Sequence, residues 1–472
     1  MLTANFITLK NYICHGWSFS NRAQRGATIL SLLLVWFSSL AHAQEVPELS
    51  LSDAIQLGLA ENFGIQIEEK NVEIAENNNN WGAAGRWPTI NFSISQDNNF
   101  RNVDNPASFL QGLTISNDVS PSVGVNWVLF GGFRVLANRE RLQTLEELSR
   151  GNAQVVIENA VEGIINQYYL VQLEQERLSV LRKVFNLSKD RYDYVKLRGE
   201  LGSAVTFDIL QEQTAYLTDS SNYVTQEISA VNARRNLNLL MGQEVGERYS
   251  LSDSLAVTPN EYAVEDLYER MIASNSNLRN QHLNLEIAQA DTRLNKAELY
   301  PQLSLNINGS YNISRQDLSQ AELQRPLEEP ITIARTTNYA AGLTLNYLLF
   351  DGGRVRRAIE NSYTQQQIGQ LQIEELKLTL RNELAATYDL YNVRQKLLSI
   401  AELSVSSADL NLRLAEERFR NGTINSFNYR DIQLNYLNAA LNHLQAEYNL
   451  IESETALLRL TGGITSEYGN IN

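Results

Sequence analysis

The sequence predicts a mixed α/β membrane protein, in which four β-barrel strands per chain are joined to long coiled α-helices in two tandem repeats. Three observations predict this fold class: a secretion signal at the start, two long stretches with apolar residues at seven-residue spacing, and four segments in which apolar and polar residues alternate. The chain has 472 residues, of which 43% are hydrophobic, so it can bury a large core. Its formal charge of −15 excludes nucleic acid as a favoured partner.

Residues 1–43 have the pattern of a secretion signal. Basic residues precede an apolar stretch, residues 27–40, which ends in the small-x-small cleavage pattern Ala41-His42-Ala43. The alternative is a membrane anchor, but about 14 apolar residues are fewer than the roughly 20 that a spanning helix needs. The only cysteine, Cys14, lies in this segment, so cleavage would leave no thiol and no disulfide. Cleavage would also remove three basic residues and no acid, so the formal charge of −15 would become −18.

The remaining chain contains two copies of one pattern. Arg86-Trp87-Pro88 and Leu299-Tyr300-Pro301 each precede a strand-like run, and from Phe130 and Phe350 onward the two halves match at a constant offset of 220 residues. Each half is predicted as helix, strand, strand, long helix, tight turn and return helix. The expected ranges are 44–242 for the first repeat, 243–261 for a linker and 262–472 for the second repeat, with strands at about 88–96, 120–130, 301–313 and 339–350 and turns at 199–206 and 420–426.

The long helices are predicted from two features. All eight prolines lie outside residues 131–241 and 351–461, so neither stretch contains a helix breaker. A helix from Phe133 to Arg198 would be about 100 Å long. Apolar residues at seven-residue spacing predict left-handed supercoiling against neighbouring helices, the alternative being an ordinary solvated coiled coil. These residues are Ile164, Val171, Leu178, Phe185 and Tyr192, then Leu384, Tyr391, Leu398, Val405, Leu412 and Phe419, and on the return helices Leu217, Val224 and Val231, then Leu437, Leu444, Ile451 and Leu458.

The four predicted strands alternate apolar residues with small or polar ones. Such segments fit a barrel with lipid outside and water inside, whereas the alternative is a half-buried sheet of a soluble protein. The smallest membrane barrels need about eight strands, so several copies of the chain must combine to close one. Val125, Leu305 and Leu345 are expected to face lipid, and Asn126, Asn306 and Asn346 to face water.

Four motifs resemble those of the TolC-like outer membrane efflux protein family, over almost the whole chain after residue 43. They are Leu129-Phe130-Gly131-Gly132, Leu349-Phe350-Asp351-Gly352-Gly353, and the turns Gly202-Ser203-Ala204-Val205-Thr206-Phe207 and Gly422-Thr423-Ile424-Asn425-Ser426-Phe427. The resemblance implies a homotrimer whose strands form one barrel among outer-membrane lipids and whose helices form a periplasmic tunnel. It also implies an exit duct of a tripartite efflux pump or type I secretion system, with an inner-membrane transporter and a periplasmic adaptor protein as partners. The alternatives are a self-contained outer-membrane porin or adhesin, and a soluble periplasmic coiled-coil scaffold.

The glycine motifs carry two expectations. The resemblance implies that the turns dock the adaptor, at Gly202, Ser203, Gly422 and Thr423. The pairs Gly131-Gly132 and Gly352-Gly353 are expected to form a tight passage from strand to helix. Glycine-rich turns before a helix can also bind phosphates, but these pairs lack the Lys-Ser/Thr of a phosphate loop.

The channel aperture is expected just past the second turn. Family members often carry two acids spaced three residues apart there, and the matching residues are Asn428 and Asp431. Asp208, 220 residues before Asn428, is expected to supply the missing charge. The alternative is that Asp208 and Asp431 are acids favoured at helix starts. Phe419 and Ile424 replace a Tyr and an Arg of some members, which implies that polar links closing the aperture are partly absent.

The sequence lacks the patterns of an enzyme. After residue 43 the only histidines are His282 and His443, and neither is spaced to a second metal ligand. No Ser-His-Asp order, paired-carboxylate pocket or dinucleotide motif is present. We therefore expect no catalytic residues, no bound metal and no cofactor.

Overall fold

A computed structural model describes residues 47–105, 107–323 and 328–468 of the chain. The predicted secretion signal, residues 1–43, lies outside the described residues. The chain divides into two compact units. In the smaller one, which includes Arg248–Ser250, the Ser250 N–H donates to the Pro47 carbonyl at 3.0 Å. The larger one contains all the long helices and strands.

The long helices of the two halves have matching bounds. Helices α4 (Arg134–Glu200) and α8 (Arg354–Arg420) have 67 residues each, and α5 (Thr206–Leu240) and α9 (Ser426–Leu460) have 35 each. The predicted helix from Phe133 to Arg198 therefore begins one residue later and ends two residues later. The predicted turns 199–206 and 420–426 shorten to residues 201–205 and 421–425, because the helices continue into them.

The shorter elements complete the chain order. None of the described helices is long and apolar enough to cross a membrane. The shorter helices are α2 (Leu51–Glu61), α3 (Phe63–Asn78), α6 (Val264–Ser274), α7 (Ser276–Ala297) and α10 (Ile464–Tyr468), and the short strands are β1 (Glu48–Leu49), β4 (Ser250–Leu251) and β6 (Ala321–Leu323).

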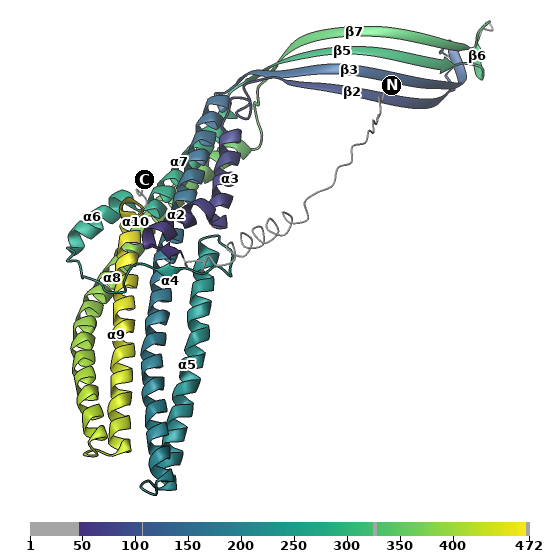
Figure 1. Ribbon diagram of the computed structural model, residues 1–472. Helices are drawn as coiled ribbons and strands as arrows, with labels where there is room; N and C mark the ends of the chain where they lie inside the picture. Colours follow the sequence, from purple (N-terminus) through teal and green to yellow (C-terminus); the bar gives the residue numbers. More distant parts are fainter. Residues whose placement is uncertain (1–46, 106, 324–327, 469–472) are drawn as a thin grey trace, which may run out of the picture. The chain divides into compact units, whose positions relative to one another are not determined.

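The four long helices pack in the order α5, α4, α9, α8 (Figure 1). Helix α4 contacts both α5 and α9, and α9 contacts α8. Helices α5 and α8 are therefore the two edges of the array, and each has one side without a helix partner in the described part of the chain.

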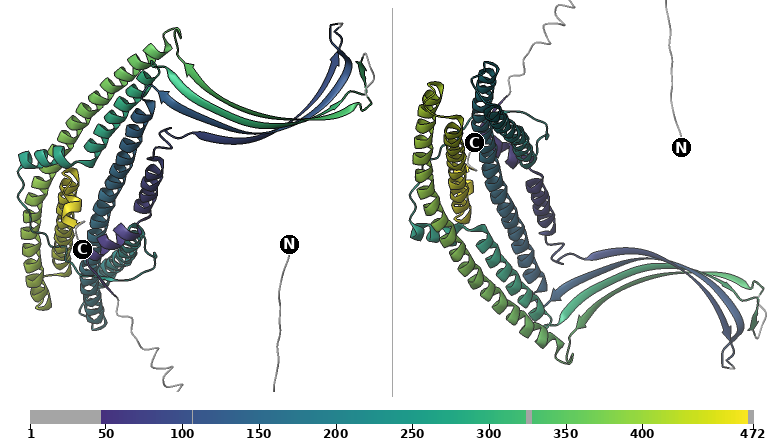
Figure 2. Two further views of the ribbon diagram at one scale, coloured as in Figure 1. Left: turned by 90° about the horizontal axis from the view of Figure 1, so that it is seen from above. Right: turned by 90° about the horizontal axis from the view of Figure 1, so that it is seen from below.

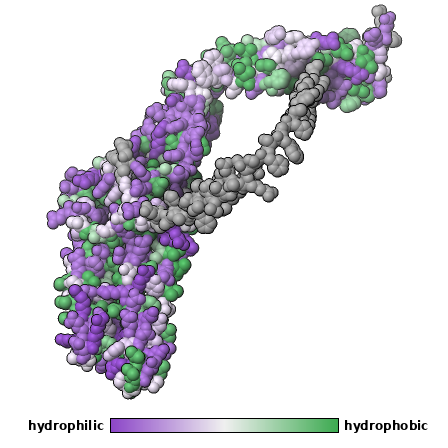
Figure 3. Space-filling view, in the orientation of Figure 1, coloured by the Kyte–Doolittle hydropathy of each residue, from purple (hydrophilic) through white to green (hydrophobic). Residues whose placement is uncertain are grey.

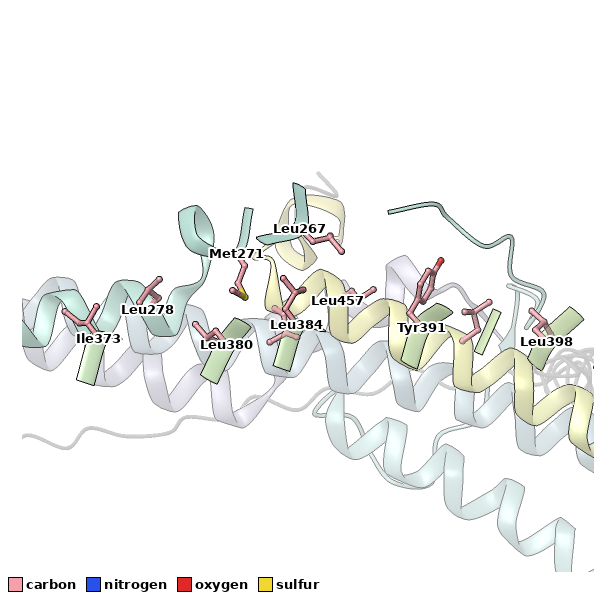
Figure 4. Close-up of a cluster of buried hydrophobic side chains, with 11 residues drawn as sticks. Leu267, Met271, Leu278, Ile373, Leu380, Leu384, Tyr391, Leu398 and Leu457 are labelled. Carbon is pink, nitrogen blue, oxygen red and sulfur yellow. The ribbon is translucent and has the colours of Figure 1, made fainter. Parts of the chain in front are cut away.

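The predicted seven-residue pattern of the second half is confirmed as a packing face. Leu384, Tyr391 and Leu398 are almost fully buried and belong to one apolar core cluster (Figure 4). Residues of α6, α7 and α9 complete this cluster, including Met271 and Leu457. Burial of side chains at this spacing holds α8 against three neighbouring helices, which is the geometry that the period predicts.

In the first half, the seven-residue pattern is buried at Ile164 and Val171 of α4 and exposed at Leu217 and Val224 of α5. Ile164 and Val171 are fully buried, but Leu217 and Val224 on α5 are 56% and 58% exposed. Their spacing of seven residues is that of a packing face, yet α5 is an edge of the array. Within the described part of the chain no helix covers that side of α5, so the described chain does not supply the neighbouring helix that the pattern predicts for these two residues.

The four long strands form one antiparallel path in the order β2, β3, β5, β7. They twist together along their length (Figure 2). Their bounds are Thr89–Val103, Leu110–Gly131, Gln302–Asp317 and Ile331–Asn346, and the three-residue β6 pairs with the start of β3.

The strands are longer than predicted, and one is shifted. The predicted strand 339–350 is β7, which begins at Ile331 and ends at Asn346. The alternating pattern continues to Tyr347 and Leu349, but Asn346 pairs with Gln302, the first residue of β5. Beyond that pair no strand remains for the segment to pair with, so it leaves the sheet.

The register places residues of one kind on one face. Val125 pairs with Ile307, and Leu303 pairs with Leu345, so apolar residues of neighbouring strands share a face. On the opposite face the Ser93 and Ser122 hydroxyls are hydrogen-bonded at 2.8 Å. The two faces of the sheet therefore differ in chemistry, as the alternation predicts.

Candidate functional site

The two helix turns have the same backbone structure. Gly202 and Gly422 have φ of +72° and +70°, in the left-handed region that favours glycine. In each turn the following N–H, of Ser203 or Thr423, donates back to a carbonyl five residues earlier, at 2.8 and 2.9 Å. The side-chain hydroxyls of the same two residues donate to the same carbonyls. Both helices thus end in a hydrogen-bonded glycine cap that reverses the chain.

The turns present apolar side chains to solvent. Leu201, Val205, Phe207 and Phe427 are each more than half exposed. Large apolar residues on an exposed turn are typical of surfaces that bind another protein. The four predicted docking residues lie among them, at the ends of the long helices.

The predicted aperture residues lie on two different helices. Asp208 is in the first turn of α5, where the helix dipole favours an acid. Asp431 is exposed and lies past the first turn of α9, where this effect of the dipole is small. Asn428 is exposed, and its N–H donates to the Asn425 side chain that caps α9. In the described residues no hydrogen bond or ion pair joins Asp208 to Asp431.

Aromatic side chains surround Phe419, the residue at which the sequence predicts that a polar link is absent. Phe419 stacks on Tyr429 with ring centroids 5.1 Å apart and meets Tyr194 of α4 edge-on at 6.0 Å. The guanidinium of Arg191 lies 5.4 Å from the Tyr429 ring centroid. Aromatic contacts of Phe419 therefore join α8 to α4 and α9.

A buried ionic network lies above the turns and was missed from the sequence. Arg191 of α4 contacts Glu212 of α5, and both side chains are only 2% exposed. The second guanidinium nitrogen of Arg191 donates to the Gln433 side chain at 2.8 Å. Because Gln433 belongs to α9, this network joins the two halves of the chain.

The network continues to a second ion pair. Arg430 of α9 donates two hydrogen bonds to Asp219 of α5, at 2.5 and 2.8 Å, and Ser188 of α4 donates to the same carboxylate at 2.6 Å. A sequence signal for it existed, because Glu212 and Asp219 stand where the second half has Ile432 and Ala439. Charges in place of apolar residues at core positions indicate a paired buried network.

The strand-to-helix passages differ from the prediction in one residue. Gly132, Gly352 and Gly353 all have positive φ, but Gly131 is the last residue of β3 and has no positive φ. The residue equivalent to Gly353 is Phe133, the only described non-glycine residue with positive φ, at 68°. Gly131 therefore ends the strand, and Gly132 and Phe133 form the turn that leads into α4. Phe133 holds this strained conformation while packing edge-on against Phe130 and Tyr300.

One carboxylate links both passages. Glu298, which follows α7, accepts from Arg134 at 3.3 Å and from Arg354 at 3.1 Å. These arginines are the first residues of α4 and α8. At the second passage, hydrogen bonds from the Val355, Gly353 and Arg354 N–H groups lower the pKa of Asp351, which therefore stays ionised at the helix start.

Comparison with known families agrees with the motif resemblance. A model of the outer membrane efflux protein family matches residues 54–243 and 267–463 of the chain. These two segments cover both predicted repeats, including both turns and both passages.

Two curated relatives are similar over much of the chain. The pyoverdine export outer membrane protein OpmQ of Pseudomonas aeruginosa is 25% identical over 292 residues, 60% of this chain and 54% of that protein. The probable efflux pump outer membrane protein TtgC of Pseudomonas putida is 22% identical over 330 residues, 68% of this chain and 64% of that protein. The chain thus spans between half and two thirds of the length of these relatives.

Solved structures share the fold. The outer-membrane channel OprN aligns with a TM-score of 0.68 and 19% identity, over 88% of this chain and 90% of that one. The Campylobacter jejuni CmeC outer membrane channel aligns with a TM-score of 0.71 and 14% identity, over 88% and 85%. Each of these channels shares the arrangement of strands and long helices with this chain, although its sequence is very different. The likeness therefore shows the fold alone.

Proposed function

Because the chain belongs to the outer membrane efflux protein family, we propose that it is the outer-membrane exit duct of a tripartite efflux pump or type I secretion system. It is a passive conduit and not an enzyme, and it exports small molecules or polypeptides across the periplasm and outer membrane. One observation carries this proposal. Within the described residues, the sheet has two opposite edges without a strand partner, and the helix array has two opposite edges without a helix partner. A chain with two open edges is one segment of a larger closed wall.

The sheet edges suit pairing between copies. Strands β2 and β7 each lack a partner on one side within the described chain. Each neighbour along the path is antiparallel, so β2 and β7 run in opposite directions and a pair between copies is antiparallel as well. Membrane barrels have this antiparallel pattern and no open edge in lipid. We propose that four strands from each of three copies form one barrel.

The exposed faces of helices α5 and α8 also suit contact between copies. Helix α5 exposes Leu217 and Val224, and α8 exposes Ile400 and Leu403, each 65% or more on α8. Figure 3 shows hydrophobic patches on the surface of the long helices. Contact of α5 in one copy with α8 in the next buries both sets. Such a head-to-tail contact, repeated, closes into a ring. The family resemblance supports a ring of three, with the helices as a periplasmic tunnel, and the matched helix bounds support two tandem repeats.

Cysteine crosslinking tests this assembly, since the chain after the predicted signal has no native cysteine. Leu217→Cys and Leu403→Cys in one chain should give covalent dimers and trimers on oxidation in outer-membrane fractions. The matched control is Leu217→Cys with Leu434→Cys, because Leu434 lies on α9, away from the edge. Crosslinks in the control but not in the edge pair would contradict the assembly. Retention of an adaptor by the crosslinked trimer would distinguish an exit duct from a porin, adhesin or soluble scaffold.

The turns are proposed as the docking site for the periplasmic adaptor and the inner-membrane transporter. Exposed apolar residues around Gly202-Ser203 and Gly422-Thr423 support this role. Replacing both glycines with valine should abolish export and leave the trimer in the membrane, because a β-branched residue is strained at positive φ. A Cβ at either glycine would meet no atom within 4 Å, so the effect is confined to the turn.

Export of a pump substrate and the amount of membrane trimer are the two measurements for this variant. Ala204→Val is a control that adds a β-branched side chain to the turn without replacing a positive-φ residue. Loss of the trimer in the double glycine variant would show that the glycines serve folding alone. Normal export in the double glycine variant would show that the turns are not the docking site.

Asp431 and Asp208 are proposed as acids of the channel aperture, next to Asn428. Three copies around one axis would focus a negative potential, which attracts cations and repels anions. The channel should therefore be cation-selective, and divalent cations added from the turn side should reduce its current. Asp431→Ala should weaken both effects, and Asp208→Ala in addition should weaken them further.

Planar-bilayer recordings decide this prediction through reversal potentials and divalent titrations. Glu416→Gln is a suitable control, because Glu416 is an acid near the turn that already pairs with Arg420 at 2.6 Å. Unchanged selectivity and unchanged block in the double variant would leave both aspartates without a role in conduction.

A further inference from the structure

The apolar face of the sheet carries several polar residues over two adjacent rows, far from the helices. Along β5 this face carries Leu303, Leu305, Ile307, Tyr311 and Ile313, and then Arg315. The same change occurs on the other strands, where residues of this face are Asn98 on β2, Asn117 on β3 and Arg335 on β7.

The strand register aligns these polar residues across the sheet. Asn98 pairs with Asn117, and Asn117 pairs with Arg315. Arg335 pairs with Ile313, two residues before Arg315, so the two arginines are diagonal neighbours on adjacent strands. Asn117 also donates a side-chain hydrogen bond to Asn98. Asn98, Asn117 and Arg315 thus form one polar row across three strands, which meets Ile333 on β7, and Arg335 lies one level nearer the helices.

Neither arginine forms a salt bridge within the described residues, although the charge of Arg315 interacts with that of Asp317 two residues along the same strand. Both side chains are exposed. The nearest acid on this face, Asp317, accepts from the Ser319 N–H at 3.0 Å and from its hydroxyl at 2.5 Å. Two guanidinium groups and one carboxylate on this face leave the patch with a net positive charge.

The position of the row matches the edge of a membrane. Strands rise about 3.3 Å per residue and tilt by roughly 40° in membrane barrels, so the stretch from Leu303 to Ile313 is about 25 Å tall. This is the height of the apolar band of such barrels. The row beyond Arg315, where the strands extend past the band, contains Phe100, Ile115 and Ile331 together with Asp317. The arginines therefore lie at the head groups of the leaflet that is farther from the helices.

We propose that Arg315 and Arg335 bind the phosphate groups of a phosphorylated glycolipid in the outer leaflet of the outer membrane. This proposal rests on the proposed membrane assembly. A guanidinium donates paired hydrogen bonds to phosphate oxygens, and two of them on neighbouring strands match a lipid that carries more than one phosphate. A trimer has three such sites, spaced around the barrel.

The test is equilibrium binding of fluorescent diphosphoryl lipid A to the purified, detergent-solubilised trimer. Arg315→Gln with Arg335→Gln should weaken binding by about tenfold or more, because charged hydrogen bonds are lost. Arg101→Gln is the matched control, since Arg101 lies at nearly the same level of β2 but on the opposite face. It should bind like the wild type. Dephosphorylated lipid A should bind the wild type as weakly as diphosphoryl lipid A binds the double variant.

Equal affinity of wild type and double variant for diphosphoryl lipid A would overturn the proposal. So would equal affinity of the wild type for the phosphorylated and dephosphorylated lipids. The amount of trimer in the same membranes, measured by native gel electrophoresis, separates the two proposals. If trimers form but the arginine substitutions leave lipid affinity unchanged, only the proposed lipid site is wrong. An absence of trimers in wild-type membranes would instead refute the proposed function.

Discussion

Arginine in place of Leu305 should destabilise the membrane-inserted trimer by about 2–4 kcal/mol, whereas arginine in place of Asn306 should have little effect. Leu305 lies on the apolar face of the central strand β5, between Trp127 and Leu343 of its neighbours. A charge there must leave water for the hydrocarbon region. Asn306 lies on the opposite face, where its amide donates to Thr344 at 3.3 Å, and this face is expected to contact water in the channel.

The two variants are a matched pair, because adjacent residues of one strand differ only in the face they occupy. The amount of trimer in outer-membrane fractions and its guanidinium midpoint after extraction are the measurements. The same comparison of single variants can be made on β7, between Leu345→Arg and Asn346→Arg, and on β3, between Val125→Arg and Asn126→Arg. Equal losses within each pair would show that the assignment of the faces is wrong.

Methionine in place of Arg191 should destabilise the helical region by about 3–5 kcal/mol. Arg191 and its partner Glu212 are both almost completely buried, so the substitution leaves a carboxylate in the core without a cation. It also removes the hydrogen bond to Gln433, which joins the two halves of the chain. The guanidinium midpoint of the helical circular dichroism signal measures the effect.

A double variant distinguishes the lost ion pair from lost packing. Arg191→Met with Glu212→Leu removes both charges and should recover much of the stability, because apolar residues of similar volume replace buried ion pairs at little cost. Arg356→Met is the control for an exposed pair, since Arg356 and Glu360 are both largely exposed. If the double variant were as unstable as the single one, the buried charge of Glu212 would not be the cause.

The sequence by itself determined the periodic elements. Helix bounds followed within two residues from the absence of proline and the seven-residue pattern, because both depend on local geometry. The two faces of the strands followed from alternation for the same reason. The glycines at the turns followed too, since a positive φ at a helix end selects glycine in any context.

The tertiary structure alone decided which periodic faces have partners. Leu437 and Leu217 occupy equivalent positions in the two halves, yet the first is buried in the core and the second lies on an open edge. Burial depends on which helices are neighbours in space, and a local pattern contains no such information. The end of β7 at Asn346 and the left-handed Phe133 follow from contacts with β5 and Tyr300. The Arg191–Glu212 pair joins residues of two helices, so only their packing shows that these charges neutralise each other.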